Sequence, residues 1–386
     1  MLFVKSTELK AGMRLARPIY NKNGVLLYER NSKLTPQGIN SVKNFGLLGI
    51  FVLEPAEPVP PMTQDDIAFE RFQTMTVFAI QDELTRVIDK GHAQKTLLIA
   101  EEVIRNYGHL DKKINLIQSL RSKEDFIYKH ALNVAILCAL IAHRLNLKRE
   151  DQQDAVIAAM VHDIGKLTVS ESVRDKIEWD EFDREDVQEA EIRGHALIEK
   201  AYSSTGMRRA CLQAQKLQYD FKHGVRTEAK ITVPAKILTV ANTFDEMTAM
   251  QFGGEPASEV SALKLLLENP DVFDPDIVEA LIHSINILAA GTSVELNTGE
   301  KAVVIRQNEE DILRPMILTF HDNNIVDLSN EMLYGDLEIK DIMKTLDNRY
   351  IMTTHLLKQN GIEVDTPDYV SVDGEEVEEY VPGRDF

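Results

Sequence analysis

The chain has 386 residues, of which 44% are apolar, and it carries a net charge of −19 and only two cysteines. The length predicts two or three structural units, and the acidic charge argues against binding of nucleic-acid polymers, which requires a basic surface. Two cysteines are typical of a reducing cytoplasm. The first residues lack the apolar segment of a signal peptide, and no apolar run reaches about 18 residues. We therefore expect a cytoplasmic protein that does not cross a membrane.

Residues 1–55 predict a small α+β module. Short apolar runs lie on both sides of the segment from Asn21 to Gly24, whose composition is typical of a hairpin turn. One short helix is predicted over residues 34–45. The proline-rich stretch 56–63 that follows predicts a stiff linker and therefore a domain boundary.

Helical spacing dominates the middle of the chain. Apolar residues recur at intervals of three and four from residue 64, which predicts a helical pair over 64–109 with a break at Gly91. A pair of this length is suited to forming a homodimer, which we keep as a hypothesis. Nearly every segment of 110–288 has the same period, so we expect six or more helices around one core.

The pattern changes at residue 289. Two strand-like runs surround the segment from Asn297 to Gly299 and further runs follow, so residues 289–335 predict a small β-rich appendage. Residues 339–359 predict a helix, and an acidic tail completes the last segment, 336–386. The predicted fold class is therefore mainly α, with an all-helical core, a small α+β N-terminal module and a small β-rich C-terminal appendage.

The stretch from Met160 to Lys166 carries the clearest chemical signal. His162 and Asp163 lie side by side at the end of an apolar helical segment. Burying these two groups is costly unless something neutralises them, and a divalent metal does so because neutral His and ionised Asp are both ligands. Lys166 follows within a turn, where its ammonium could stabilise a phosphate oxygen. The alternative is a surface lysine that interacts favourably with a helix C-terminus.

Two further histidines are candidate ligands. His130 lies in an apolar helix predicted over residues 125–145, and the downstream His-Asp pair favours a ligand over a hydrogen-bonded core histidine. His195 belongs to an acidic helix, and its pattern fits a metal ligand and a partly exposed surface histidine equally well. Cys138 lies in the same apolar helix as His130 and predicts a core thiol, neither a disulfide nor a nucleophile.

A family resemblance enters with the order and spacing of these residues. His130, the run from His162 to Lys166, His195 and the run from Ile237 to Thr248 resemble the HD-GYP branch of the HD phosphohydrolase superfamily. The resemblance covers roughly residues 110–285. It implies an all-helical domain that holds two or three metals, usually iron or manganese, and opens cyclic di-GMP to linear pGpG.

The resemblance also implies a role for each matched residue. His130, His162 and Asp163 would be metal ligands, with Asp163 bridging two ions. Lys166 would act in catalysis by contacting the substrate phosphate, and His195 would serve the second metal. Metal-bound hydroxide would then attack phosphorus in line.

Three departures from the family pattern reduce this implied site. The His-His-Glu and Gly-Tyr-Pro motifs expected after His195 are absent from the corresponding region, Leu217 to Arg226. Asn242 stands where the family has an Asp, and an uncharged amide oxygen binds a cation more weakly. Phe126 stands four positions before His130, where some members place an acidic residue, so a third metal is not expected.

The first metal would therefore keep His130, His162, Asp163 and a weakened Asn242. The second would keep only Asp163 and His195, with Asp220, His223 or Asp245 as candidate substitutes for the missing ligands. Of these, Asp245 is better explained as a cap or brace of its own helix.

Three functions follow from this pattern. We favour a divergent domain of bacterial cyclic-di-GMP signalling whose metal site is partly eroded. Such a domain would be weak or inactive as a phosphodiesterase and would bind a cyclic dinucleotide or a signalling protein. The alternatives are an active cyclic-di-GMP phosphodiesterase with a remodelled site and a mononuclear HD nucleotide phosphohydrolase. If a cofactor is present, we expect one or two divalent ions of iron or manganese.

Overall fold

The computed structural model describes the chain in eight segments, which are residues 2–21, 23–44, 49–53, 63–116, 125–174, 181–227, 230–249 and 257–342. The chain divides into two compact units. One unit combines residues 1–75 with 287–386, and the other consists of residues 76–286.

The N-terminal module is a small α+β structure, as predicted. Its elements are β1 (Leu2–Lys5), β2 (Arg14–Leu15), β3 (Ile19–Tyr20), β4 (Leu26–Tyr28), α1 (Pro36–Asn44) and β5 (Gly49–Leu53). Strands β1, β5 and β2 form an antiparallel sheet in that order. The core of the module includes Leu15, Leu34 and Val52. The linker predicted over residues 56–63 lies outside the described residues except for residue 63.

The predicted hairpin turn is confirmed between β3 and β4, which pair antiparallel. Gly24 has a φ of 72°, in the left-handed region that glycine tolerates best, and its N–H donates to the carbonyl of Asn21 at 2.9 Å. The Asn21 side chain also accepts the N–H of Asn23 and of Val25, which closes the turn locally. The helix predicted over 34–45 is likewise present as α1.

The C-terminal part of the same unit is an antiparallel sheet in the order β10-β6-β7-β8-β9. Its elements are β6 (Ser293–Leu296), β7 (Lys301–Arg306), β8 (Met316–Thr319), β9 (Ile325–Asp327), the short helix α12 (Glu331–Tyr334) and β10 (Ile339–Ile342). The predicted β-rich appendage is therefore confirmed.

The helix predicted over 339–359 is wrong where the structure describes it, because residues 339–342 form strand β10. Pairing with β6 outweighs the local helical spacing, as is common for strands whose partners are distant in sequence. Ile339 is buried opposite Leu296, and Lys340 forms an ion pair with Glu295. Residues 343–386, including the rest of the predicted helix and the acidic tail, lie outside the described residues.

The helical part begins with α2 (Gln64–Lys90) and α3 (Thr96–Tyr107), which confirm the predicted pair. Gly91 ends α2 with a φ of 68°, a left-handed conformation that stops a helix at low cost. The helices that follow are α4 (Phe126–Arg144), α5 (Arg149–Val161), the 3₁₀ helix η1 (Ile164–Thr168), α6 (Glu171–Arg174), α7 (Glu181–Ala201), α8 (Thr205–Lys222), α9 (Val233–Thr248), α10 (Glu259–Glu268) and α11 (Pro275–Ile282). The prediction of six or more helices is confirmed.

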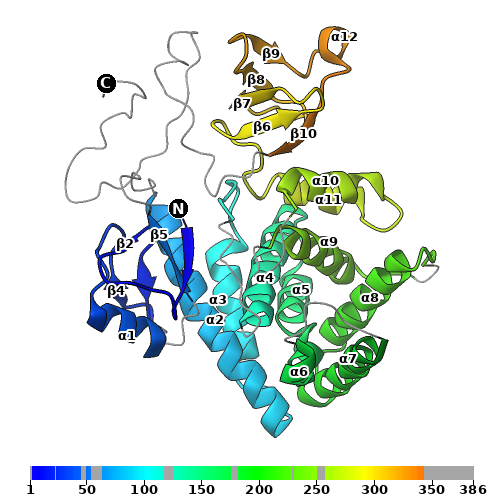
Figure 1. Ribbon diagram of the computed structural model, residues 1–386. Coiled ribbons are helices and arrows are strands. Elements are labelled where there is room, and N and C mark those ends of the chain that lie inside the picture. The colour runs from blue at the N-terminus through cyan, green and yellow to red at the C-terminus, as the bar shows by residue number, and fades with distance from the viewer. Residues whose placement is uncertain are drawn as a thin grey trace. The chain divides into compact units, whose positions relative to one another are not determined.

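Helix α4 is the central element of this domain. It packs against α3, α5, α9 and α11, and most of its residues are buried on every side, which is typical of a helix that is apolar all round (Figure 1). By length and hydropathy α4 alone among the described helices could cross a membrane, but 83% of that stretch is buried by the protein itself. Cys138 is a buried free thiol in α4, as predicted, and burial raises its pKa well above the ordinary value.

Candidate metal centre

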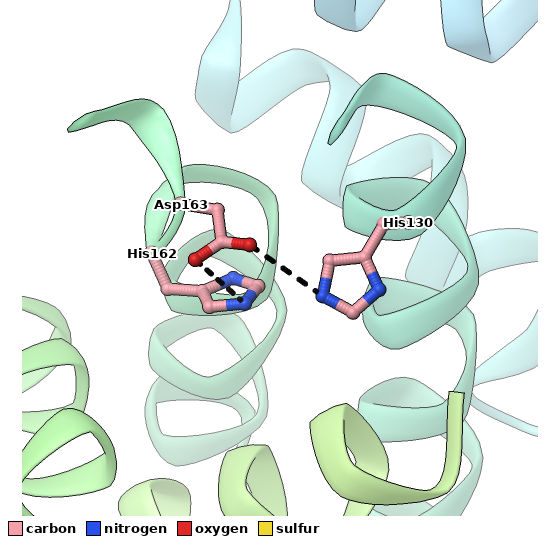
Figure 2. Close-up of side chains that lie close together, drawn as sticks. All are labelled: His130, His162 and Asp163. Carbon is pink, nitrogen blue, oxygen red and sulfur yellow. Dashed lines mark ion pairs between the residues drawn. The ribbon is translucent and has the colours of Figure 1, made fainter. Parts of the chain in front are cut away.

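Two of the central helices bring the predicted metal ligands together. His130 lies on α4, while His162 and Asp163 follow the last residue of α5. All three side chains are buried, with exposed fractions of 0%, 5% and 8% respectively. Their ligand atoms all lie within 4.8 Å of one another, and Figure 2 shows the His130 ring facing the other two side chains.

The turn from α5 into η1, and the packing of α7 on η1, explain why the His162-Asp163 pair lies beside His130. His162 still donates its N–H to the carbonyl of Ala158 at 2.9 Å, whereas Asp163 leaves α-helical geometry and begins the turn into η1. A side chain at Gly165 would place its Cβ 2.2 Å from the carbonyl oxygen of Ala190. A Cβ at Gly194 would lie 2.7 Å from the Cα of Gly165. The two glycines therefore let the backbone of α7 pack directly on η1.

Hydrogen bonds fix the orientation of both imidazoles. The Nδ1 of His130 lies 2.6 Å from a carboxylate oxygen of Asp245, and the Nδ1 of His162 lies 2.8 Å from the carbonyl oxygen of Ala159. A carbonyl and an ionised carboxylate only accept, so each Nδ1 carries a proton and donates it. In the neutral ring, Nε2 then carries the lone pair, which is the form that binds a metal. Burial lowers the pKa of His162 and so favours this neutral form.

The two Nε2 atoms converge on one oxygen. The Oδ1 of Asn242 on α9 lies 2.6 Å from Nε2 of His130 and 2.9 Å from Nε2 of His162. In neutral rings oriented in this way, the Nε2 lone pairs of both histidines point at a lone pair of the Asn242 oxygen. Three lone pairs repel one another, and a cation bound between them removes that repulsion. Without a cation, both Nε2 lone pairs would accept hydrogen bonds only if the Asn242 amide turned its NH₂ group towards the two rings. Such a turn is sterically possible because the two ends of the amide are nearly the same size. Two imidazoles, a carboxylate and an amide oxygen are a chemically suitable donor set for one divalent transition metal.

Asp163 and Lys166 supply the main charges of the site. Lys166 donates from Nζ to Oδ2 of Asp163 at 2.7 Å and lies 3.7 Å from a carboxylate oxygen of Glu246. Burial alone would raise the pKa of Asp163, but the Lys166 ammonium and the two imidazoles hold it well below its usual value. Burial alone would lower the pKa of Lys166, but Asp163 and Glu246 raise it above its usual value. The pair is therefore ionised throughout the neutral pH range.

The remaining predicted ligands have other partners. The Nε2 of His195 on α7 is hydrogen-bonded to the side-chain oxygen of Gln215 on α8, and the amide nitrogen of Gln215 lies 3.5 Å from the carbonyl of His162. Asp220 accepts from Lys216 and from Thr227. His223 follows the end of α8, where its ring stacks on Tyr219. Among the described residues, the His-Asp group contains none of these three predicted ligands.

Two positions that depart from the family pattern lie against His130. Phe126, where some family members have an acidic residue, stacks on the His130 ring with 5.8 Å between centroids. Hydrocarbon therefore covers that face of the imidazole. Asn242 lies in the position expected of a ligand, as described above, with an amide in place of a carboxylate.

Asp245, which the sequence offered as a substitute ligand or, more readily, as a brace for its own helix, contacts His130 in the structure. Its two oxygens contact His130 at 2.6 Å and the amide of Asn133 at 3.1 Å, and its side chain is fully buried. A carboxylate that holds the far nitrogen of a metal-binding histidine fixes the ring and raises its basicity. The signal available in the sequence was its spacing, since Asp245 lies three residues after Asn242 and so shares its helix face.

Replacing Asp245 by Asn is expected to weaken divalent-metal binding about 10- to 100-fold, because the amide holds His130 in place without a negative charge. Isothermal titration of the metal-free protein with Mn²⁺ measures this change. The matched control is Asp274→Asn, which removes a partly exposed carboxylate that pairs with Lys236 of α9 and lies outside the His-Asp group. Unchanged Mn²⁺ affinity in the Asp245 variant would show that His130 is not a ligand oriented in this way.

Residues 115–277 match the HD domain family. The chain is 23% identical over 249 residues to a cyclic di-GMP phosphodiesterase of Pseudomonas aeruginosa, covering 61% of this chain and 57% of that protein. It is 30% identical over 171 residues to the 3′3′-cGAMP-specific phosphodiesterase 3 of Vibrio cholerae, covering 43% of this chain and 37% of that protein.

The chain therefore contains an HD domain over residues 115–277, as the resemblance to the HD phosphohydrolase superfamily predicted. Its matched relatives are cyclic-dinucleotide phosphodiesterases, and it aligns with 57% and 37% of their lengths. HD domains are metal-dependent, and His130, His162 and Asp163 form a group that could hold the ion. The identity of the metal stays a prediction, as do cytoplasmic localisation and a homodimer.

Proposed function

We propose that this HD domain binds a cyclic dinucleotide beside a single divalent metal ion and hydrolyses it weakly or not at all. The observation that carries the proposal is the asymmetry of the donor set. His130, His162, Asp163 and Asn242 converge as donors for one ion, whereas His195 is hydrogen-bonded to Gln215. The ligand class comes from the two relatives, whose names specify cyclic di-GMP and 3′3′-cGAMP.

Different residues of this chain would orient the metal ligands and contact the phosphate. A bound ion would supply Lewis acidity and a lowered pKa for a coordinated water. Asp245 and the carbonyl of Ala159 hold the two imidazoles in the ligand orientation. Lys166 has three N–H groups, of which one serves Asp163, so another is available for a phosphate oxygen.

Weak hydrolysis follows from the charges near Lys166. In phosphodiester cleavage negative charge develops on the phosphate oxygens, and cations beside them lower the barrier. Here the Lys166 ammonium is shared with Asp163 and lies 3.7 Å from Glu246, so much of its charge is already neutralised. Glu191 on α7 is a further carboxyl group near Lys166 and Asp163, and burial raises its pKa above the ordinary value.

A second candidate function is that of a mononuclear nucleotide phosphohydrolase. The convergence of two imidazoles, one carboxylate and one amide oxygen favours it, because four donors with an adjacent ammonium form a plausible centre for one catalytic ion. This function would give a linear product from a cyclic dinucleotide, or turnover of another nucleotide, with only one metal bound.

The test combines metal analysis with ligand binding on anaerobically purified protein. We expect one iron or manganese per chain, micromolar binding of cyclic di-GMP or 3′3′-cGAMP by calorimetry, and little linear product by chromatography. The His162→Ala variant should lose the metal, whereas His283→Ala, which removes a partly exposed imidazole near Glu279, should not. Two metals with rapid pGpG formation would instead support an active phosphodiesterase. Absence of both metal and dinucleotide binding would refute the proposal.

A further inference from the structure

We propose that the ammonium of Lys166 occupies the second cation position at Asp163, so that the centre combines one divalent ion with one built-in side-chain cation. This inference rests on the proposed function, because it requires a metal held by His130 and His162. It gives a reason, in the geometry of the centre, why a second metal would not bind.

The first step is the way Asp163 uses its oxygens. Its Oδ1 lies 3.7 Å from Nε2 of His162 and its Oδ2 lies 3.8 Å from Nε2 of His130, so both oxygens face the imidazoles where the first ion would bind (Figure 2). Its Oδ2 accepts from Lys166 at 2.7 Å. A carboxylate that bridges two metals needs lone pairs towards both ions. Here Oδ2 faces His130 and also accepts from an ammonium, so a second ion at Oδ2 would have to displace that ammonium.

The second step is the charge around Lys166. Asp163 and Glu246 both lie within 4.0 Å of its Nζ, at 2.7 and 3.7 Å, and they come from different elements of the domain. Glu191 on α7 interacts electrostatically with both Lys166 and Asp163. One ammonium between the two carboxylates of Asp163 and Glu246 leaves the position negative overall, which is the environment that a cation position requires. Lys166 therefore neutralises charge that would otherwise favour a metal.

The third step is the state of the imidazole that the family resemblance assigns to the second ion. The Nε2 of His195 faces the carbonyl oxygen of the Gln215 side chain, which only accepts, so this nitrogen carries a proton. The amide nitrogen of Gln215 lies 3.5 Å from the carbonyl of His162, consistent with this orientation of the amide. His195 thus presents an N–H where a second ion would need a lone pair.

The experiment is a Mn²⁺ titration of the metal-free full chain, with bound metal counted by elemental analysis after gel filtration. The wild type is expected to bind one Mn²⁺, and Lys166→Met is expected to bind two, because Asp163, Glu246 and Glu191 then lack their ammonium. Lys166→Gln should give the same gain and serves if the Met variant folds poorly. Lys166→Arg should stay at one, because it keeps a cation.

Two further variants locate the gained ion. Adding Glu246→Gln to Lys166→Met should return the count to one, because it removes a carboxylate from the new position. Lys216→Met removes a lysine that pairs with Asp220 outside the centre, so its count should stay at one.

The outcomes separate this inference from the proposed function. One Mn²⁺ in the wild type and in both uncharged Lys166 variants would overturn the inference and leave the proposed function standing. Two Mn²⁺ in the wild type would overturn both, as would no Mn²⁺ binding in any form. A gain that persists with Glu246→Gln would place the second ion elsewhere and also overturn the inference.

Discussion

Replacing Asp163 by alanine is expected to abolish divalent-metal binding, with an affinity loss of more than about 100-fold. Asp163 is the only carboxylate in the His-Asp group that the described residues form, and it is 8% exposed. Its removal leaves two imidazoles and an amide oxygen, a neutral set that holds a cation far less strongly. Elemental analysis and Mn²⁺ titration of the purified variant measure the effect.

The chain offers a matched control in Asp220. That carboxylate is also buried on a helix and paired with a lysine of its own helix, Lys216, but it lies outside the His-Asp group. Asp220→Ala is therefore expected to retain the full metal content. If it lost metal as Asp163→Ala should, then the candidate role of Asp220 as a substitute ligand would stand and our choice of centre would be wrong.

Replacing Glu83 by alanine is expected to lower the free energy of unfolding by about 3 kcal/mol. Its Oε1 accepts the backbone N–H groups of Gln94, Lys95 and Thr96, at 2.6 to 3.0 Å, and the hydroxyl of Thr96 at 3.0 Å. Helix α3 has no side-chain cap from its own N-cap residue, Lys95. A buried glutamate of α2 therefore caps α3, and its loss leaves several donors without an acceptor.

Thermal unfolding followed by circular dichroism should show this loss as a fall in the melting temperature of roughly 6–12 °C for a unit of this size. Glu102→Ala is the control, since that glutamate is exposed on α3 and paired with Arg105, and such a pair contributes little. An equal fall in the melting temperature of both variants would mean that the capping contacts of Glu83 stabilise the protein no more than an exposed ion pair does.

The contribution of Glu83 should also depend on pH. Burial raises the pKa of its carboxyl, but the backbone N–H groups and the Thr96 hydroxyl lower it more, to a value below the ordinary 4.5. A group whose pKa is lowered in the folded state stabilises fully above its unfolded pKa, and this stabilisation is lost as the pH falls through the folded pKa. The difference in stability between wild type and Glu83→Ala should therefore be constant near pH 7 and shrink below about pH 4.5.

Local patterns account for most of what could be predicted. The turn from Asn21 to Gly24, the break at Gly91 and the spacing of apolar residues are features of neighbouring residues, so they can be recognised without the fold. The same holds for His162 and Asp163, because adjacent polar groups at the end of an apolar helix already indicate a ligand that neutralises them. The strand β10 could not be recognised, because it depends on pairing with β6, some forty residues earlier in the chain.

The sequence by itself determined the helical HD domain, its His-Asp pair and the candidate ligands His130 and Asn242. Only the tertiary structure decided how these groups are used. The contact between His130 and Asp245 joins residues 115 positions apart, and the contact between His195 and Gln215 joins α7 to α8. Whether an imidazole nitrogen offers a lone pair or an N–H depends on the hydrogen-bond partners of the two ring nitrogens, and helix packing fixes those partners. Helix packing therefore determines that the side chains of His130, His162, Asp163 and Asn242 converge.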